Sequence, residues 1–246
     1  MNESICRICL TIVYLFVLGG NACAQSIEEA RAAYAEGRFI EAAEIARALG
    51  TSEGHAMAAD SLAIHGYYIA PKGEKASLFG RAEELARKAV RLDAANPQAH
   101  LQLAHAMGRQ AQVGGTLKAL KEGYATKVRD AIEEALRLDP KMAAAHVSLA
   151  AWHAGAVGAG GFFAALLYGA SEEKALAHFE RALELAPRDK VALFEYATGL
   201  LSLDAEENRA KARELLKRAI RLPPKDAFRR LVHQKAAERL AALGGG

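Results

Sequence analysis

Small and large apolar residues recur along this chain in one fixed pattern. In four segments, an alanine or valine is followed four positions later by an apolar residue, which is large in three of the segments, and after three more positions by an alanine. Residues three and four apart share one face of a helix, so each segment is predicted to be a helix that packs through this face. A proline follows each alanine within a few residues and ends the helix. The alanines are Ala89, Ala135, Ala182 and Ala219, and the prolines are Pro97, Pro140, Pro187 and Pro223.

A second apolar pattern follows each of the first three prolines. Its members are spaced by three, one and three residues, as in His100, Leu103, Ala104 and Met107, and they again fall on one helix face. Helix pairs that recur in this way are typical of an all-α repeat solenoid. We therefore expect one domain, residues 25–246, built from helical hairpins and closed by a helix with a polar outer face. The hairpins are expected at 27–50, 55–93, 97–139, 143–186 and 190–222, and the capping helix at 225–243.

The two patterns together resemble the tetratricopeptide repeat, whose second helix combines small, large and small residues before a proline. The repeat is longer here, because Ala89, Ala135 and Ala182 lie 46 and 47 residues apart, against about 34 in the usual repeat. The additional residues form two matching insertions, 114–123 and 160–169, each of which begins with a glycine pair and ends with a single glycine. Glycine permits sharp turns, so we expect each insertion to be a short helix between two turns.

The paired insertions make the chain resemble one particular family of repeat proteins. Together with the segments Ala99–Ala104, Ala145–Ala150 and Ala175–Ala182, they look like the regulator of microtubule dynamics family. This resemblance implies an all-helical repeat protein with no known catalytic site. It does not extend to microtubule binding, because the first residues of this chain indicate a different compartment.

The first 24 residues have the pattern of a secretory signal peptide. Arg7 precedes an apolar stretch, residues 8–18, that is short for a membrane span, and Ala22-Cys23-Ala24 fits the small-x-small rule for cleavage. We therefore expect export to the periplasm or cell envelope, with Gln25 as the first residue of the mature protein. The alternative is a lipid anchor on Cys23. All three cysteines lie in this segment, so the mature domain is expected to hold neither a disulfide nor a thiolate metal site.

The composition gives no support for catalysis, cofactors or nucleic-acid binding. A net charge of +3 is too small to indicate a nucleic-acid partner, and no glycine-rich phosphate loop follows a strand-like run. His100 and His146 occupy the same repeat position, which favours packed histidines bonded to the backbone or to each other. A zinc site would need a third ligand such as His105 or His153. We therefore expect no catalytic residue, no metal and no cofactor.

The concave surface is the expected binding site, because the first helix of each tetratricopeptide pair lines it. Phe194 is the expected anchor for a partner, and Arg109 would set the direction of the bound segment. The lining is expected to be mostly apolar, with Arg109 and His105 as exceptions, and to suit an apolar helical or extended segment of a partner protein. The alternative is that the chain's own insertions fill the groove. The residues predicted to line it are Gln98, Leu101, His105, Arg109, Val147, Ala151, Val191, Phe194 and Thr198.

The segment Phe162–Tyr168 is an apolar run without charge in an otherwise charged chain. The favoured interpretation is a buried plug between neighbouring repeats, because an exposed run of this kind favours aggregation. If the run is exposed, it forms a binding or membrane-contact patch. Two functional hypotheses follow. The first is a noncatalytic protein-interaction scaffold of the cell envelope, and the alternative is a membrane-associated adaptor docked through Phe162–Tyr168 or lipidated at Cys23.

Overall fold

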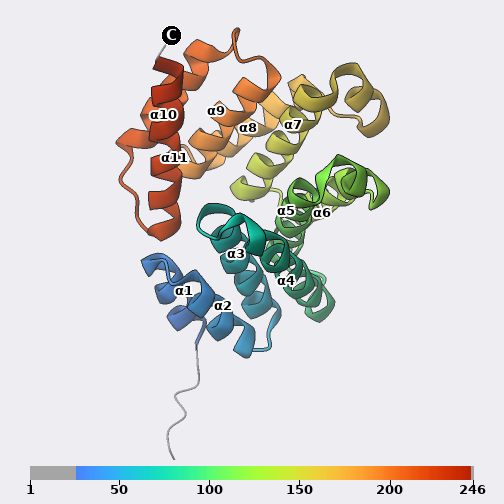
Figure 1. Cartoon of the computed structure of the whole chain (residues 1–246), viewed down its shortest axis with the longest axis vertical. Coiled ribbons are helices and arrows are strands. Elements are labelled where there is room, and N and C mark those ends of the chain that lie inside the picture. Colours follow the sequence, from blue (N-terminus) through green and yellow to red (C-terminus); the bar gives the residue numbers. More distant parts are fainter. Residues whose placement is uncertain (1–25, 245–246) are drawn as a thin grey trace, which may run out of the picture.

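The computed structural model describes residues 26–244, and the signal peptide predicted for residues 1–24 lies outside them. The regular elements within this range are all helices, and successive helices pack on one another along a curved array (Figure 1). Their bounds are α1 Ile27–Glu36, α2 Phe39–Ala48, α3 Ser52–Tyr68, α4 Lys72–Leu92, α5 Pro97–Lys121, α6 Tyr124–Leu138, α7 Ala143–Tyr168, α8 Glu172–Leu185, α9 Lys190–Leu203, α10 Arg209–Arg221 and α11 Ala227–Gly244.

The repeated apolar positions form the core of this array. The four alanines that end the sequence pattern are completely buried. The larger residues three positions before them fill the space beside them, and Ile132, Phe179 and Leu216 are all buried. Phe179 also stacks on Tyr196 of α9, with the ring centres 4.7 Å apart. Small residues let helices approach closely and large residues fill the remaining volume, which is why the sequence pattern and the core coincide.

His100 and His146 each hold the turn that precedes their helix. Nε2 of His100 lies 2.9 Å from the carbonyl oxygen of Ala94, and Nε2 of His146 lies 3.1 Å from that of Pro140, so each ring donates to the residue six positions earlier. Nδ1 of His146 also lies 2.9 Å from Nδ1 of His178 on α8. The prediction that these equivalent histidines are packed residues bonded to the backbone is confirmed.

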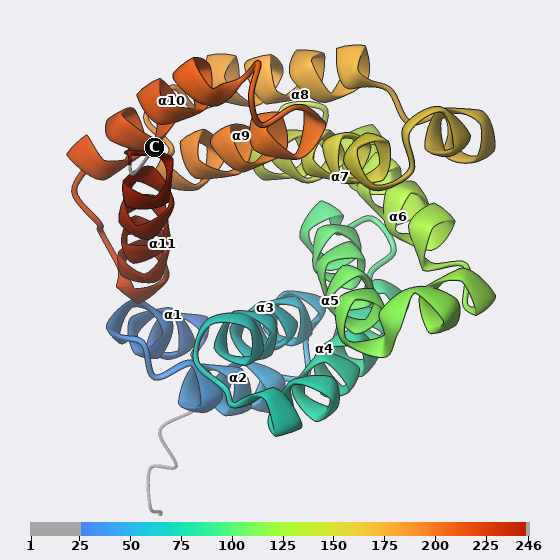
Figure 2. The ribbon, with the colours of Figure 1, turned by 45° about the horizontal axis from the view of Figure 1, so that its top comes forward.

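The array bends so far that its two ends meet (Figure 2). Gly37, which ends α1, packs so closely on Ala227 of α11 that a Cβ added to the glycine would lie 3.0 Å from the alanine Cβ. Arg230 reaches the carbonyl oxygens at the end of α1 at 3.4 and 3.5 Å. A second link joins α3 to α11, where the ring centres of Tyr68 and Phe228 lie 5.9 Å apart. The solenoid therefore closes into a ring.

The two insertions extend α5 and α7 away from the ring. In the first, Gly115 has a φ of 79° and interrupts α5, as its glycine pair predicts. The second insertion forms the last part of α7, which ends at Tyr168. Both insertions end at a glycine with positive φ, Gly123 and Gly169.

The apolar run Phe162–Tyr168 is not a buried plug where the structure describes its side chains, so that prediction is wrong. Phe163 and Leu166 are each 71% exposed, and Leu167 is 70% exposed. The cause is the length of α7. Gly158 lies against Ser202 at the very end of α9, so the residues of α7 that follow extend past the helix on which α7 packs.

Replacing Ala182 with leucine should lower the free energy of unfolding by about 1–3 kcal/mol, because the larger side chain overpacks a completely buried position. Ala177 lies on the same helix but is exposed, so Ala177→Leu is the matched control and should change stability by less than about 0.5 kcal/mol. Urea unfolding of both variants measures the difference. An Ala182→Leu variant as stable as its control would place this alanine away from a tight helix contact.

Candidate functional site

The ring encloses a chamber with a volume of about 570 Å³. Its walls come from both halves of the chain, with α3 and α5 on one side and α7, α9 and α11 on the other. The first residue that lines it is Tyr34 of α1 and the last is Arg229 of α11. The chamber is therefore a property of the whole closed ring, and no single repeat forms it.

Seven of the nine residues predicted for the concave surface line this chamber, and the other two do not. α5 supplies four of the seven, α7 supplies two, and α9 supplies one. That these side chains bind a partner stays a prediction. The seven residues are Gln98, Leu101, His105, Arg109, Val147, Ala151 and Val191.

Phe194 and Thr198 do not line the chamber, so the structure does not place the expected anchor Phe194 at this site. Phe194 is only 8% exposed and belongs to an apolar cluster that includes Val232 and Ala236 of α11. The hydroxyl of Thr198 is buried as well. α11 packs against both α9 and α10, so the capping helix occupies the part of the concave surface where a partner would have met Phe194.

The lining of the chamber is mostly apolar, as expected, but it carries more charged groups than the two exceptions that the sequence predicted. Asp60 of α3 and Glu195 of α9 line it in addition to Arg109 and His105. Glu195 did carry a signal in the sequence, because it lies one helical turn after Val191 and therefore on the same face. The residues contributed by α1, α3 and α11 were missed because only ring closure brings these helices to face α5 and α9. They are Tyr34, Asp60, Tyr67, Tyr68, Phe228 and Arg229.

A chain of polar side chains crosses the chamber wall from α7 to α1. The Ser148 hydroxyl oxygen lies 2.8 Å from Nε2 of His105, and Nδ1 of His105 lies 3.3 Å from Oε1 of Gln102. The Gln102 side chain and the Tyr34 hydroxyl in turn donate to the Asp60 carboxylate. With the His105 proton assigned to Nδ1, each donor in this chain meets an acceptor. The network fixes the position of the Asp60 carboxyl in the wall.

Burial shifts the ionisable groups of the chamber toward their neutral forms. It raises the pKa of Asp60 to about 6, although the hydrogen bonds from Tyr34 and Gln102 act in the opposite direction. Burial lowers the pKa of His105 to about 4, so this ring is neutral at pH 7. Burial also raises the pKa of Glu195, an effect that the positive charge of Arg109 partly offsets.

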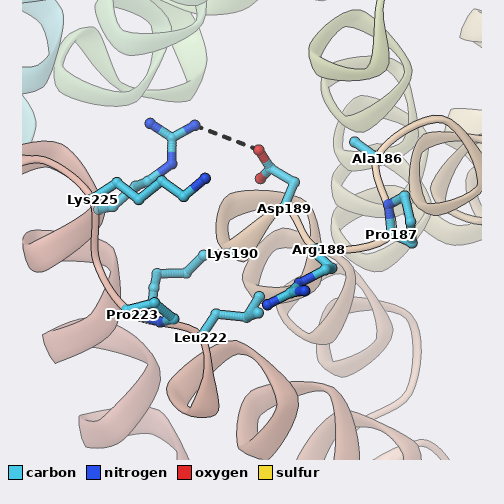
Figure 3. A pocket seen from close by; sticks show the side chains of 9 residues that line it. Ala186, Pro187, Arg188, Asp189, Lys190, Leu222, Pro223 and Lys225 are labelled. Atoms are coloured by element: carbon cyan, nitrogen blue, oxygen red, sulfur yellow. Dashed lines mark ion pairs between the residues drawn. The ribbon is translucent and has the colours of Figure 1, made fainter.

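A second pocket, with a volume of about 600 Å³, adjoins the chamber (Figure 3). The ion pair between Arg229 and Asp189, 3.6 Å between charged atoms, borders both cavities. The second pocket also holds Lys190, which is only 2% exposed. Nζ of Lys190 lies 2.7 Å from the carbonyl oxygen of Ala219 in the last turn of α10, where a positive charge complements the helix dipole. The buried lysine is therefore explained as a cap of α10.

The described residues contain no metal cluster and no membrane-spanning helix. Within residues 26–244, no group of three or more histidine, cysteine, aspartate or glutamate side chains is arranged to hold a metal ion. His105 and His153, the two residues considered as a third zinc ligand, form other hydrogen bonds. His105 is hydrogen-bonded to the Ser148 hydroxyl, and Nδ1 of His153 accepts a hydrogen bond from the amide of Ser171. The same part of the chain has no helix that is both long and apolar enough to cross a bilayer.

Comparisons with known proteins agree on the architecture. The model of the family described as "Regulator of microtubule dynamics protein 1-3" matches residues 56–244. The solved structure of TTC0263, a thermophilic tetratricopeptide-repeat (TPR) protein of Thermus thermophilus, has a TM-score of 0.61 and 18% identity over 86% of this chain and 97% of that chain. YrrB, a TPR protein described as having an unusual peptide-binding site, has a TM-score of 0.41 and 15% identity over 85% of this chain and 89% of that chain. No curated protein matches. The likeness to TTC0263 confirms the predicted TPR-type fold.

Proposed function

We propose that this chain, which belongs to the regulator of microtubule dynamics family, is a noncatalytic scaffold that holds a segment of another protein inside its ring. The observation that supports the proposal is the chamber, because helices from both ends of the array wall it and neither insertion projects a described side chain into it. TPR-type arrays are typical protein-interaction scaffolds, and a concave helical surface suits an extended or helical segment.

The size of the chamber limits how much of a partner it holds. A volume of about 570 Å³ falls in the range of ligand pockets, about 300–1,000 Å³, and accommodates a few side chains of a segment. Leu101, Val147, Ala151 and Trp152 offer apolar contacts for such side chains. A whole helix would require the contact between α1 and α11 to open.

Blocking the chamber tests this function. Gly108 lines the chamber, and a Cβ added there meets nothing within 4 Å, so Gly108→Leu should fill the chamber without disturbing the helix packing. Gly155 also has no atom within 4 Å of an added Cβ but does not line the chamber, which makes Gly155→Leu the matched control. In pull-downs from the native cell-envelope fraction, wild type and Gly155→Leu should capture the same partner, and Gly108→Leu should lose it. If Gly108→Leu retains that partner, the chamber is not the binding site.

We further infer that the protein is exported and acts in the cell envelope. The support is the sequence of residues 1–24, with its apolar core and the Ala22-Cys23-Ala24 cleavage pattern. The mature chain should then begin at Gln25, and intact mass together with N-terminal sequencing will measure this. A diacylglyceryl adduct on Cys23 would instead establish the lipid-anchored alternative, and an intact Met1 would rule out processing.

A second candidate function is contact with a membrane surface through the insertions. Leu117 of the first insertion is 83% exposed, and Leu166 and Leu167 of the second are exposed to a similar degree. Lys118 and Lys121 lie close to Leu117 in the first insertion and would favour anionic lipids. Sedimentation with phosphatidylglycerol vesicles should then carry down the wild type and leave the double variant Leu166→Ser/Leu167→Ser in solution. Equal sedimentation of the two proteins, or none of either, would remove this candidate.

A further inference from the structure

Asp60 and Glu195 line the chamber without an ion-pair partner. Throughout residues 26–244, no lysine, arginine or histidine nitrogen lies within 4.0 Å of either carboxylate. The donors Tyr34 and Gln102 satisfy the hydrogen-bonding capacity of Asp60, but they do not neutralise its charge. Charged groups removed from water are normally paired, so each of these carboxylates offers an unfilled place for a positive charge.

The cations that already line the chamber are engaged elsewhere. Arg229 is paired with two aspartates, one at the start of α9 and one just before α11. The guanidinium of Arg109 lies over the ring of Tyr67, 3.6 Å from its centre. Arg109 acts on the pKa of Glu195 from a distance but makes no ion pair with it. Three carboxylates and two guanidinium groups thus line the chamber, which gives it a negative balance in a chain whose net charge is +3.

Aromatic side chains complete the surroundings that a cation prefers. Tyr34, Tyr67, Tyr68 and Phe228 line the same chamber, and the rings of Tyr68 and Phe228 lie 5.9 Å apart. The face of an aromatic ring attracts an ammonium or guanidinium group, and the attraction grows when water is excluded. The stacking of Arg109 on Tyr67 is one such contact made within the chain itself.

From this combination we propose that the chamber binds an organic cation, an ammonium or guanidinium group carried on an apolar stem, with Asp60 and Glu195 as its counter-charges. The aromatic rings would enclose the stem and the cationic head, and the alanine and valine side chains of α7 would pack on the rest of the ligand. The proposal rests on the chamber being the binding site, as proposed above, and it names the chemistry of the group that enters.

The charge of Asp60 gives this binding a defined pH dependence. The groups that face Asp60 are Tyr34 of α1, Gln102 of α5 and Asp226 before α11, and none of them is positively charged. The carboxyl titrates with a pKa of about 6, so it is protonated at pH 5 and ionised at pH 7.5. A cation should therefore bind more tightly as the pH rises from 5 to 7.5.

The only tryptophan of the chain, Trp152, lines the chamber and reports on its occupancy. Tryptophan fluorescence should be titrated at pH 7.5 with n-hexylammonium, and with n-hexanol and hexanoate as neutral and anionic ligands of the same length. We expect n-hexylammonium to bind at least about tenfold more tightly than n-hexanol, a difference of about 1.4 kcal/mol. We expect hexanoate to bind more weakly than either.

Two neutral isosteres locate the charge that is responsible. Asp60→Asn and Glu195→Gln should each weaken n-hexylammonium binding several-fold and leave n-hexanol binding unchanged. Glu214→Gln removes one negative charge from a position on α10 outside the chamber and should have no effect. Circular dichroism verifies that each variant is folded, and either chamber variant alone suffices for the test.

Each outcome of the titrations has a distinct meaning. If n-hexanol and n-hexylammonium bind equally, the chamber binds apolar groups and the cation proposal is overturned, whereas the scaffold function stands. If neither changes the fluorescence, the cation proposal is overturned, and the Gly108→Leu pull-down decides separately whether the chamber has any partner. Binding that is unchanged in both chamber variants places the cation site elsewhere.

A cationic group can enter the chamber as a free amine or as a basic side chain of a partner segment. An extended heptapeptide of leucine and alanine with one central lysine, compared with the same peptide carrying norleucine, distinguishes these sources. Tighter binding of the lysine peptide than of n-hexylammonium indicates a protein segment. Binding of n-hexylammonium alone indicates a small amine and separates the cation site from the scaffold function.

Discussion

Phe194→Ala is expected to lower the free energy of unfolding by about 3–5 kcal/mol and to leave ligand binding by the folded ring unchanged. The side chain is 8% exposed and lies in an apolar cluster to which every helix from α7 to α11 contributes. Its removal leaves a cavity where the capping helix packs, and the surrounding helices relax only in part. For a domain of this length the melting temperature should fall by roughly 10 °C.

Two further variants provide reference values for this decrease in the free energy of unfolding. Phe179→Ala removes a side chain that is 1% exposed at the large position of the repeat, so its cost should be similar. Leu117→Ala truncates a side chain that is 83% exposed, and its cost should stay below about 0.5 kcal/mol. Urea unfolding measures the three stabilities, and the Trp152 titration measures binding. A Phe194→Ala variant that is stable but binds the n-hexylammonium probe poorly would restore Phe194 as a binding residue.

The burial of Phe194 shows where sequence periodicity stops being informative. The spacing of Leu193, Tyr196, Ala197 and Leu200 correctly predicts a helix and its buried face, because that face is set by neighbours close in sequence. Whether Phe194, on the flank of that face, is buried or open depends on α11, which begins more than thirty residues later. The sequence shows that α11 is a capping helix, but it does not show which part of the concave surface this helix covers.

The chamber depends on an even longer-range property. Each repeat adds a small rotation, and the sum of these rotations decides whether a solenoid stays open or closes. No residue pattern within one repeat encodes that sum, so the sequence does not predict the meeting of Gly37 with Ala227. Asp60 and Phe228 become candidate binding residues only through this closure, whereas His105 and Arg109 are predicted because α5 alone positions them.

The insertions show a third feature that the sequence does not predict. Gly115 adopts a positive φ and interrupts α5, as its glycine pair predicts, but the sequence did not predict that apolar residues of the second insertion are exposed. Leu166 and Leu167 are exposed because they follow Gly158, which lies against the end of α9, and the sequence does not show where α9 ends relative to α7.

Gly158→Ala and Gly155→Ala are expected to change stability in opposite directions, although the two glycines lie on one helix. A Cβ at Gly158 would lie 2.1 Å from the carbonyl oxygen of Ser202 and 2.9 Å from its carbonyl carbon. These are backbone atoms at the end of α9, which cannot rotate away as a side chain can. α7 and α9 must therefore separate, at a cost of about 1–3 kcal/mol or more.

At Gly155 an added Cβ meets nothing within 4 Å, so Gly155→Ala should raise the free energy of unfolding by about 0.5–1 kcal/mol through the higher helix propensity of alanine. Urea unfolding of the two variants against wild type provides the measurement, and the methyl group added is the same in both. Opposite signs of the change in the free energy of unfolding would show that the loss at Gly158 comes from the close contact of α7 with α9. A general effect of replacing glycine in this helix would have the same sign in both variants. Two variants that are both stabilised would mean that α7 does not touch Ser202, and the exposed end of α7 would then have to be explained without the end of α9.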